Sequence, residues 1–172
     1  TAKAHQGYIT VESRPGRGSR FDLYLPAAGS TLITEDEIGD IYEGVTGRVL
    51  LIDDESLILD VATQTLENKE FEVEAFSGSE EALAYYKLHW KDVSVIILDM
   101  IMPGMSGIEV WHHLKAINPD AKVIISSGYS VKGDAQKILD EGGKAFLQKP
   151  FRLDVLTKTV AKVMTESDNA PS

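Results

Sequence analysis

From residue 48 onward the chain alternates short apolar runs with longer stretches that place apolar residues at helical spacing. The short runs predict strands over residues 48–52, 71–75, 93–98, 122–126 and 144–148. The longer stretches predict helices that include residues 57–68, 82–90, 108–117, 131–141 and 153–165. Strands this apolar are typical of a parallel sheet that is covered on both faces. The sequence therefore predicts an α/β fold, a (βα)5 doubly wound parallel five-stranded sheet.

Local signals mark where several of these helices begin and end. Ser77 with Glu80, and Ser106 with Glu109, have the spacing of capping boxes. Asn118-Pro119 is expected to end one helix, and Gly142-Gly143 to end another.

Polar residues stand at the carboxyl ends of four predicted strands. They are Asp53-Asp54-Glu55, Asp99, Ser126-Ser127-Gly128 and Lys149-Pro150. The carboxyl ends of parallel strands share one edge of the sheet, where such folds bind ligands. Carboxylates gathered there suit a hard divalent cation such as Mg²⁺. One of them could instead attack a phosphoryl group, while a lysine neutralises the transferring oxygens.

The stretches LLIDDE, ILDMIMPGMSG, VIISSGYS and AFLQKPF make residues 47–167 resemble the receiver domains of response regulators, which have a flavodoxin-like, CheY-like fold. The resemblance implies that Asp99 accepts a phosphoryl group from a phosphohistidine and that Lys149 pairs with the phosphate. It implies Mg²⁺ bound directly by Asp54, Asp99 and the backbone carbonyl of Ile101, with Asp53 acting through water. Ser127, rather than Ser126, would be the switch hydroxyl, and Phe146 the switch aromatic. One departure is the missing glycine after the first helix, where Lys69-Glu70 precede Phe71.

Residues 7–25 alternate as a β-hairpin, with its turn at residues 14–18. Residues 1–26 resemble the last strands of the ATP-binding domain of sensor histidine kinases. The matching residues are His5, Gly7, Val11, Ser13, Gly16, Gly18, Ser19, Phe21, Leu25 and Pro26. We therefore expect a kinase remnant over residues 1–26, an acidic linker over 27–46, the receiver over 47–167 and a polar tail over 168–172. This is the order of a hybrid histidine kinase.

The kinase's ATP-binding and phosphorylatable-histidine motifs are not found in this sequence, so we expect no autophosphorylation from ATP. The expected partners are a histidine kinase phosphohistidine domain and a histidine-containing phosphotransfer protein. The open edges of the hairpin allow a homodimer. Ile101 and Tyr129 flank the site and are expected to hinder an attacking water.

Composition limits the kinds of site and partner that the chain can have. The chain has no cysteine, which excludes disulfides and thiolate metal sites. A net charge of −10 argues against nucleic acid as a partner. No apolar run approaches the roughly 20 residues that cross a membrane, so we expect a cytoplasmic fragment, whose parent kinase could be membrane-anchored.

Two other functions stay open. The first is an aspartate-nucleophile phosphatase, although Ile101 occupies the position where such enzymes commonly carry a second, acidic aspartate. The second is a receiver-like interaction module that is never phosphorylated, against which the complete set of site residues argues.

Overall fold

A computed structural model describes residues 8–14, 18–24, 44–128 and 132–166. The described elements fall into two units, one holding β1 and β2 and the other holding β3 to α5. In the first unit β1 (Tyr8–Arg14) pairs antiparallel with β2 (Gly18–Tyr24), from Tyr8 opposite Tyr24 to Arg14 opposite Gly18. The predicted hairpin is therefore confirmed. The residues of its turn, 15–17, lie outside the described residues, as do 27–43 of the predicted linker, while the expected homodimer stays a prediction.

The second unit contains a five-stranded parallel sheet in the order β4-β3-β5-β6-β7. The strands are β3 (Arg48–Ile52), β4 (Glu72–Phe76), β5 (Val93–Asp99), β6 (Val123–Ser127) and β7 (Ala145–Gln148). The helices are α1 (Ser56–Glu67), α2 (Ser79–His89), α3 (Gly107–Ile117), α4 (Lys132–Asp140) and α5 (Leu153–Thr165). The predicted α/β fold is confirmed, and the predicted bounds of β3 and α5 are met at both ends.

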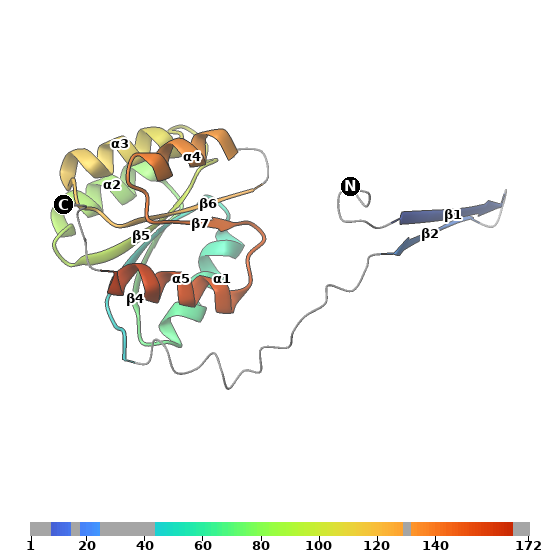
Figure 1. The fold of residues 1–172 in the computed structure, drawn as a ribbon, viewed down its shortest axis with the longest axis horizontal. Coiled ribbons are helices and arrows are strands. Elements are labelled where there is room, and N and C mark those ends of the chain that lie inside the picture. The colour runs from blue at the N-terminus through green and yellow to red at the C-terminus, as the bar shows by residue number, and fades with distance from the viewer. Residues whose placement is uncertain (1–7, 15–17, 25–43, 129–131, 167–172) are drawn as a thin grey trace. The chain divides into compact units, whose positions relative to one another are not determined.

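Two apolar cores lie on opposite faces of this sheet (Figure 1). Helices α1 and α5 cover one face and α2, α3 and α4 cover the other. Successive strand residues alternate between the cores: Ile124 packs on the α1 and α5 face, whereas Ile125 packs on the opposite one. This alternation decides which side chains can meet at the sheet's edge. None of the helices described combines the length and apolar character that a bilayer span requires.

One predicted capping box is confirmed and the other is wrong. Ser106 caps α3 reciprocally: its backbone N–H donates to the Glu109 carboxylate at 2.9 Å, and its hydroxyl accepts from the Glu109 N–H at 3.4 Å. Helix α2 instead begins at Ser79, after the extended residue Gly78, with no side-chain cap. The predicted pair Ser77 and Glu80 is therefore off by one residue. A carboxylate oxygen of Glu81 occupies the space that a Cβ at Gly78 would need.

The end of α1 explains how the chain manages without the expected glycine. Glu70 adopts a left-handed conformation with φ 66°. Its N–H donates to the Glu67 carbonyl at 3.0 Å, and the Phe71 N–H donates to the Leu66 carbonyl at 3.2 Å. These are the two bonds of a Schellman motif, in which glycine usually takes the left-handed position. Phe71 and Leu66 are both buried in the α1 and α5 core, which adds the apolar contact that accompanies this motif.

Candidate functional site

Asp53 follows β3 directly and is held by backbone groups on both sides. Its N–H donates to the Phe76 carbonyl at 3.1 Å, and its Oδ1 accepts from the Glu55 N–H at 3.0 Å. Glu55 is the extended residue that precedes α1. The carboxylate is thus fixed where the strand turns into the helix. Burial raises the pKa of Asp53, against the opposing effect of its bond to Lys149.

Asp99 is the last residue of β5, and the backbone that follows it is packed closely. The Ile101 N–H donates to Asp99 Oδ1 at 3.3 Å, and the Met100 N–H donates to the Ser126 carbonyl at 3.1 Å. A Cβ at Gly107 would lie 2.6 Å from Met100 Cα and 2.9 Å from the Asp99 carbonyl oxygen. Glycine at this position therefore lets the start of α3 lie directly against the end of β5.

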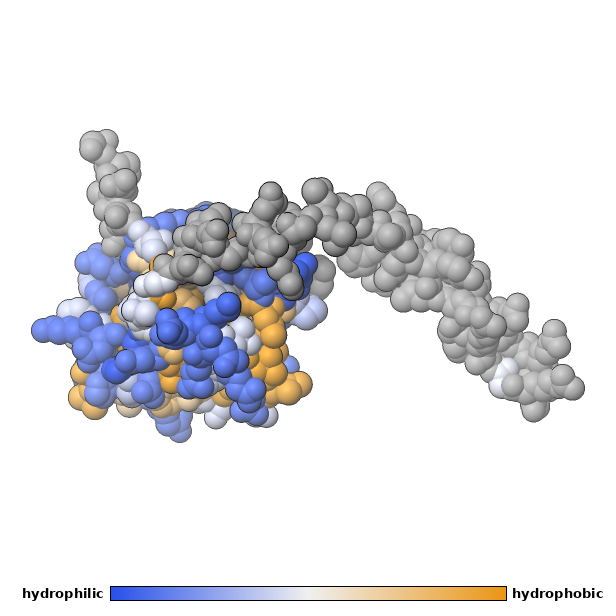
Figure 2. Space-filling view, turned by 90° about the horizontal axis from the view of Figure 1, so that it is seen from below, coloured by the Kyte–Doolittle hydropathy of each residue, from blue (hydrophilic) through white to orange (hydrophobic). Residues whose placement is uncertain are grey.

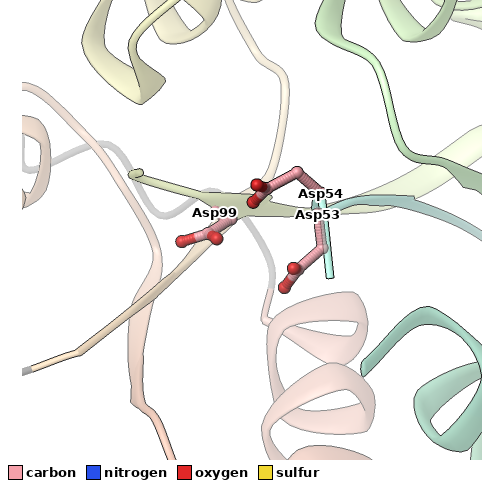
Figure 3. Close-up of side chains that lie close together, drawn as sticks. All are labelled: Asp53, Asp54 and Asp99. Carbon is pink, nitrogen blue, oxygen red and sulfur yellow. The ribbon is translucent and has the colours of Figure 1, made fainter. Parts of the chain in front are cut away.

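The three aspartates predicted to bind a metal lie together. One carboxylate oxygen from each of Asp53, Asp54 and Asp99 lies within 4.8 Å of the others. Figure 3 shows the three carboxylates gathered at the ends of β3 and β5. Asp53 and Asp99 are 1% and 4% exposed, whereas Asp54 is open to solvent. Two buried carboxylates and an exposed third offer the oxygen donors that a hard cation prefers, with a path to water.

Lys149 forms ion pairs with two of these carboxylates, Asp53 and Asp99, and with Glu55. Its Nζ lies 2.7 Å from Asp53 Oδ2, 2.9 Å from Asp99 Oδ2 and 3.1 Å from Glu55 Oε1. Its side chain is only 12% exposed. Burial alone would lower the pKa of Lys149, but its bonds to Asp53 and Asp99 outweigh that effect and raise it. The ammonium group therefore stays charged, and one cation is shared among three carboxylates.

Ser127 and Phe146, the predicted switch residues, lie in β6 and β7. Ser127 is fully buried, its hydroxyl donates weakly to the Gly128 carbonyl at 3.4 Å, and its own carbonyl accepts from the Lys149 N–H at 2.8 Å. Phe146 lies opposite Ile125 and packs against the core under α2, α3 and α4. Strand alternation puts Ser127 on that same face. Tyr129 lies outside the described residues.

Two features escaped sequence analysis. The run Asp53-Asp54-Glu55 drew attention to its aspartates, yet Glu55 also reaches Lys149. Ser126, set aside in favour of Ser127, is 1% exposed, and its hydroxyl has no hydrogen-bond partner among the described residues. Both depend on side-chain placement, which spacing in the sequence does not determine.

Comparison with known proteins identifies a family, several curated relatives and solved structures that are similar to this chain. The model of the response regulator receiver domain matches residues 49–161. Sensor kinase CckA of Brucella abortus is 26% identical over 171 residues, which cover 94% of this chain and 18% of that protein. The chain spans between 18% and 33% of the length of the first four curated relatives that it matches.

Solved structures agree with the fold. A response regulator receiver domain protein from Clostridium thermocellum has a TM-score of 0.66 and 32% identity, covering 69% of this chain and 94% of that one. CheY in the CheX-CheY-BeF₃-Mg²⁺ complex from Borrelia burgdorferi has a TM-score of 0.65 and 27% identity, covering 70% and 90% of the two chains.

Proposed function

Because the chain belongs to the response regulator receiver family of two-component signalling, we propose that Asp99 accepts a phosphoryl group from a phosphohistidine. The observation that supports this most directly is the buried Asp99 carboxylate, which shares the Lys149 ammonium with Asp53. A buried carboxylate next to a fixed cation can form an acyl phosphate, because the cation neutralises charge on the incoming group.

In the proposed reaction a carboxylate oxygen of Asp99 attacks the phosphorus atom. The new O–P bond forms as the P–N bond to the donor imidazole breaks, and the electron pair of that bond stays with the imidazole nitrogen. Lys149 already contacts Asp99 Oδ2, so its ammonium group lies beside the oxygens that gain charge. The Ile101 N–H at 3.3 Å orients the other oxygen, Oδ1.

The donor set fits Mg²⁺. The carboxylates of Asp53, Asp54 and Asp99 converge, and the Lys149 ammonium contacts two of them, which leaves excess negative charge and a set of oxygen ligands. We propose that Asp54, Asp99 and the Ile101 carbonyl hold the ion directly and that Asp53 does so through water. When bound, Mg²⁺ would neutralise phosphoryl oxygens. The Borrelia burgdorferi neighbour, whose complex contains Mg²⁺ and BeF₃, supports this choice.

We propose that Ser127 and Phe146 act as the switch pair that reports phosphorylation. They lie near the ends of adjacent strands and on the face of the sheet that α2, α3 and α4 cover. Among the described residues the Ser127 hydroxyl has one long bond, of 3.4 Å to Gly128, which it can exchange for a bond to a new phosphate. Phosphoprotein signalling would then proceed through protein contacts.

The chain's origin in a hybrid histidine kinase is also a proposal. The alignment with Sensor kinase CckA covers 94% of this chain, so it includes β2 and at least part of β1 as well as the receiver. On this proposal residues 1–26 end a kinase ATP-binding domain, 27–46 link it to the receiver at 47–167, and 168–172 form a tail. The partners would be the kinase phosphohistidine domain and a histidine-containing phosphotransfer protein, in the cytoplasm.

Phosphorylation by acetyl phosphate, followed by intact mass, tests the proposed function. We expect a Mg²⁺-dependent adduct of about 80 Da, one phosphoryl group, on the wild-type chain. Asp99→Asn should abolish the adduct, whereas Asp92→Asn, which changes a carboxylate 63% exposed at the opposite edge of the sheet, should retain it. A wild-type chain that neither forms the adduct nor binds beryllofluoride would contradict the proposal, and an adduct that survives in Asp99→Asn would reassign the acceptor.

A further inference from the structure

Ser126 carries a buried hydroxyl that the structure leaves unsatisfied. The residue is 1% exposed, and its Oγ has no hydrogen-bond partner among the described residues. A buried polar group without a partner costs stability, so each one in a folded protein calls for a physical reason. Thr63 in α1 carries the other such hydroxyl in the described part of the chain.

The sheet register places Ser126 beside the phosphoryl acceptor. Ser126 lies directly opposite Asp99 on β5 and opposite Leu147 on β7. Ile124 and Leu147 pack on the α1 and α5 face, and strand alternation puts Ser126 on that face as well. Ile97 packs there too, so Asp99, two residues later, shares the face with Ser126. Ser127, one residue further along β6, belongs to the opposite face.

The positively charged side chain of Lys149 extends past β6, the strand that contains Ser126. It follows β7 yet reaches Asp99 at the end of β5 and Asp53 after β3. Neighbouring strands are about 4.8 Å apart, so two spacings, roughly 10 Å, separate β7 from β5. Strand β6 lies between them. Leu147 packs on the α1 and α5 face, and strand alternation puts Lys149, two residues later, on the face that carries Ser126.

We infer that Ser126 is a second hydroxyl donor to the phosphoryl group on Asp99, acting from the face opposite Ser127. Phosphorylation brings strong acceptor oxygens to Asp99. The Ser126 hydroxyl, which has no hydrogen-bond partner among the described residues, can then donate to one of them. Ser126 is then a positioning residue, which holds the phosphoryl group between two strand faces. This inference rests on the proposed function of Asp99.

The two states of the chain make opposite demands on Ser126, and this gives a sharp test. In Ser126→Ala the unliganded chain loses an unsatisfied buried group, so its urea midpoint should rise. The same variant should bind beryllofluoride, with Mg²⁺ saturating, about tenfold more weakly, as expected for one lost hydrogen bond to a charged group. Its affinity for Mg²⁺ alone should stay unchanged. Calorimetric titration measures both affinities.

Thr63→Val is the matched control, because it removes the other unsatisfied hydroxyl from a position seven residues beyond the start of α1. It should raise the urea midpoint and leave beryllofluoride binding as in the wild type. Ser126→Cys, which keeps the size and a weak donor, should bind beryllofluoride with an affinity between those of Ser and Ala; it also serves if Ser126→Ala does not fold.

The outcomes separate the two proposals. A wild-type chain that neither forms the acetyl phosphate adduct nor binds beryllofluoride overturns the function proposed for Asp99. A wild-type chain that binds it, with Ser126→Ala and Ser126→Cys within twofold of its affinity, overturns the role of Ser126 alone. A weakening of Mg²⁺ binding equal to that of beryllofluoride binding would also overturn it, because the effect would then act through the metal ligands.

Discussion

The two edges of the five-stranded sheet both carry ionic contacts, but they treat charge differently. At the carboxyl edge Asp53 and Asp99 are buried and share the nearly buried Lys149 with an exposed carboxylate. At the amino edge Arg48 and Glu72 form a pair, with Nη2 and Oε2 at 2.7 Å and side chains that are 28% and 69% exposed. One edge holds an unbalanced buried cluster, and the other holds a balanced pair in contact with water.

A hollow of about 500 Å³ lies at the amino edge. Its lining residues are Thr46, Gly47, Arg48, Glu70, Glu72, Asp92 and Ser94. Polar groups are thus present at both edges, and at the amino edge they line a hollow. What distinguishes the carboxyl edge is charge that has been taken out of water without being neutralised, which costs free energy that a ligand or a covalent group can recover. Figure 2 shows hydrophilic and apolar side chains mixed on the one face of the receiver unit that it presents.

Removing the shared cation should give the largest effect on stability. In Lys149→Met three carboxylates lose their common partner, so the free energy of unfolding at pH 7 without divalent cations should fall by about 3 kcal/mol. Mg²⁺ should restore part of the loss by neutralising the same carboxylates. Urea unfolding in EDTA and in Mg²⁺ measures both effects.

Arg48→Met is the control at the other edge, and it should change the urea midpoint much less, because an exposed pair contributes little. Mg²⁺ should not alter that result. Equal losses for the two variants would contradict the contrast between the edges.

Neutralising one acid of the cluster should act in the opposite direction and more weakly. Burial raises the pKa of Asp53 above its ordinary value, so the folded chain disfavours the ionised form. Asp53→Asn should therefore stabilise the metal-free chain at pH 7, on the order of 1 kcal/mol, while weakening Mg²⁺ binding. Lys149 keeps Asp99 and Glu55 as partners in this variant.

The sign of the pH dependence follows from the same shift. The destabilisation by ionised Asp53 is complete above its raised folded-state pKa and absent below its unfolded value of about 3.9. The advantage of Asp53→Asn should therefore shrink as the pH falls through that interval. Urea midpoints measured from pH 7 downward give the curve, and an advantage that grows toward acid would contradict it.

The smallest expected effect belongs to the amino edge. Glu70 holds a left-handed conformation that costs an L side chain free energy, and glycine avoids this cost. Glu70→Gly should raise the free energy of unfolding by about 0.5 kcal/mol, after allowing for the greater entropy of glycine in the unfolded chain. Lys69→Gly, at a position without positive φ, should instead lower it. Labelling by acetyl phosphate should be unchanged in Glu70→Gly, although the residue lines the hollow at the amino edge.

Much of this structure could be predicted because it depends on local patterns. The run Arg48–Ile52 is apolar throughout and forms the predicted strand, and α5 spans Leu153–Thr165 as its spacing indicates. Parallel strands then bring Asp53, Asp99 and Lys149 to one edge without further information. The sequence shows that the usual glycine after α1 is missing, but it does not show that Glu70 adopts the left-handed conformation in place of that glycine.

The remaining features depend on side-chain placement in three dimensions. Ser77 and Glu80 have the spacing of a capping box, yet the helix starts one residue later, with Gly78 before it and the Glu81 carboxylate beside Gly78. Ser126 and Ser127 are both serine, and only the register and alternation of β6 put Ser126 opposite Asp99 and Ser127 on the other face. Neither outcome can be reached by counting residues.

The reach of Lys149 over β6 has a consequence for the order in which the domain is made. Lys149 stands 50 residues after Asp99 in the chain, so a ribosome delivers both aspartates long before the cation that they share. Until β7 has docked, the nascent sheet carries its acids without their counterion. On the proposed chemistry, an unfinished or truncated copy cannot draw phosphate away from the donor. On that chemistry, the docking of β7 sets the earliest moment at which Asp99 can be phosphorylated.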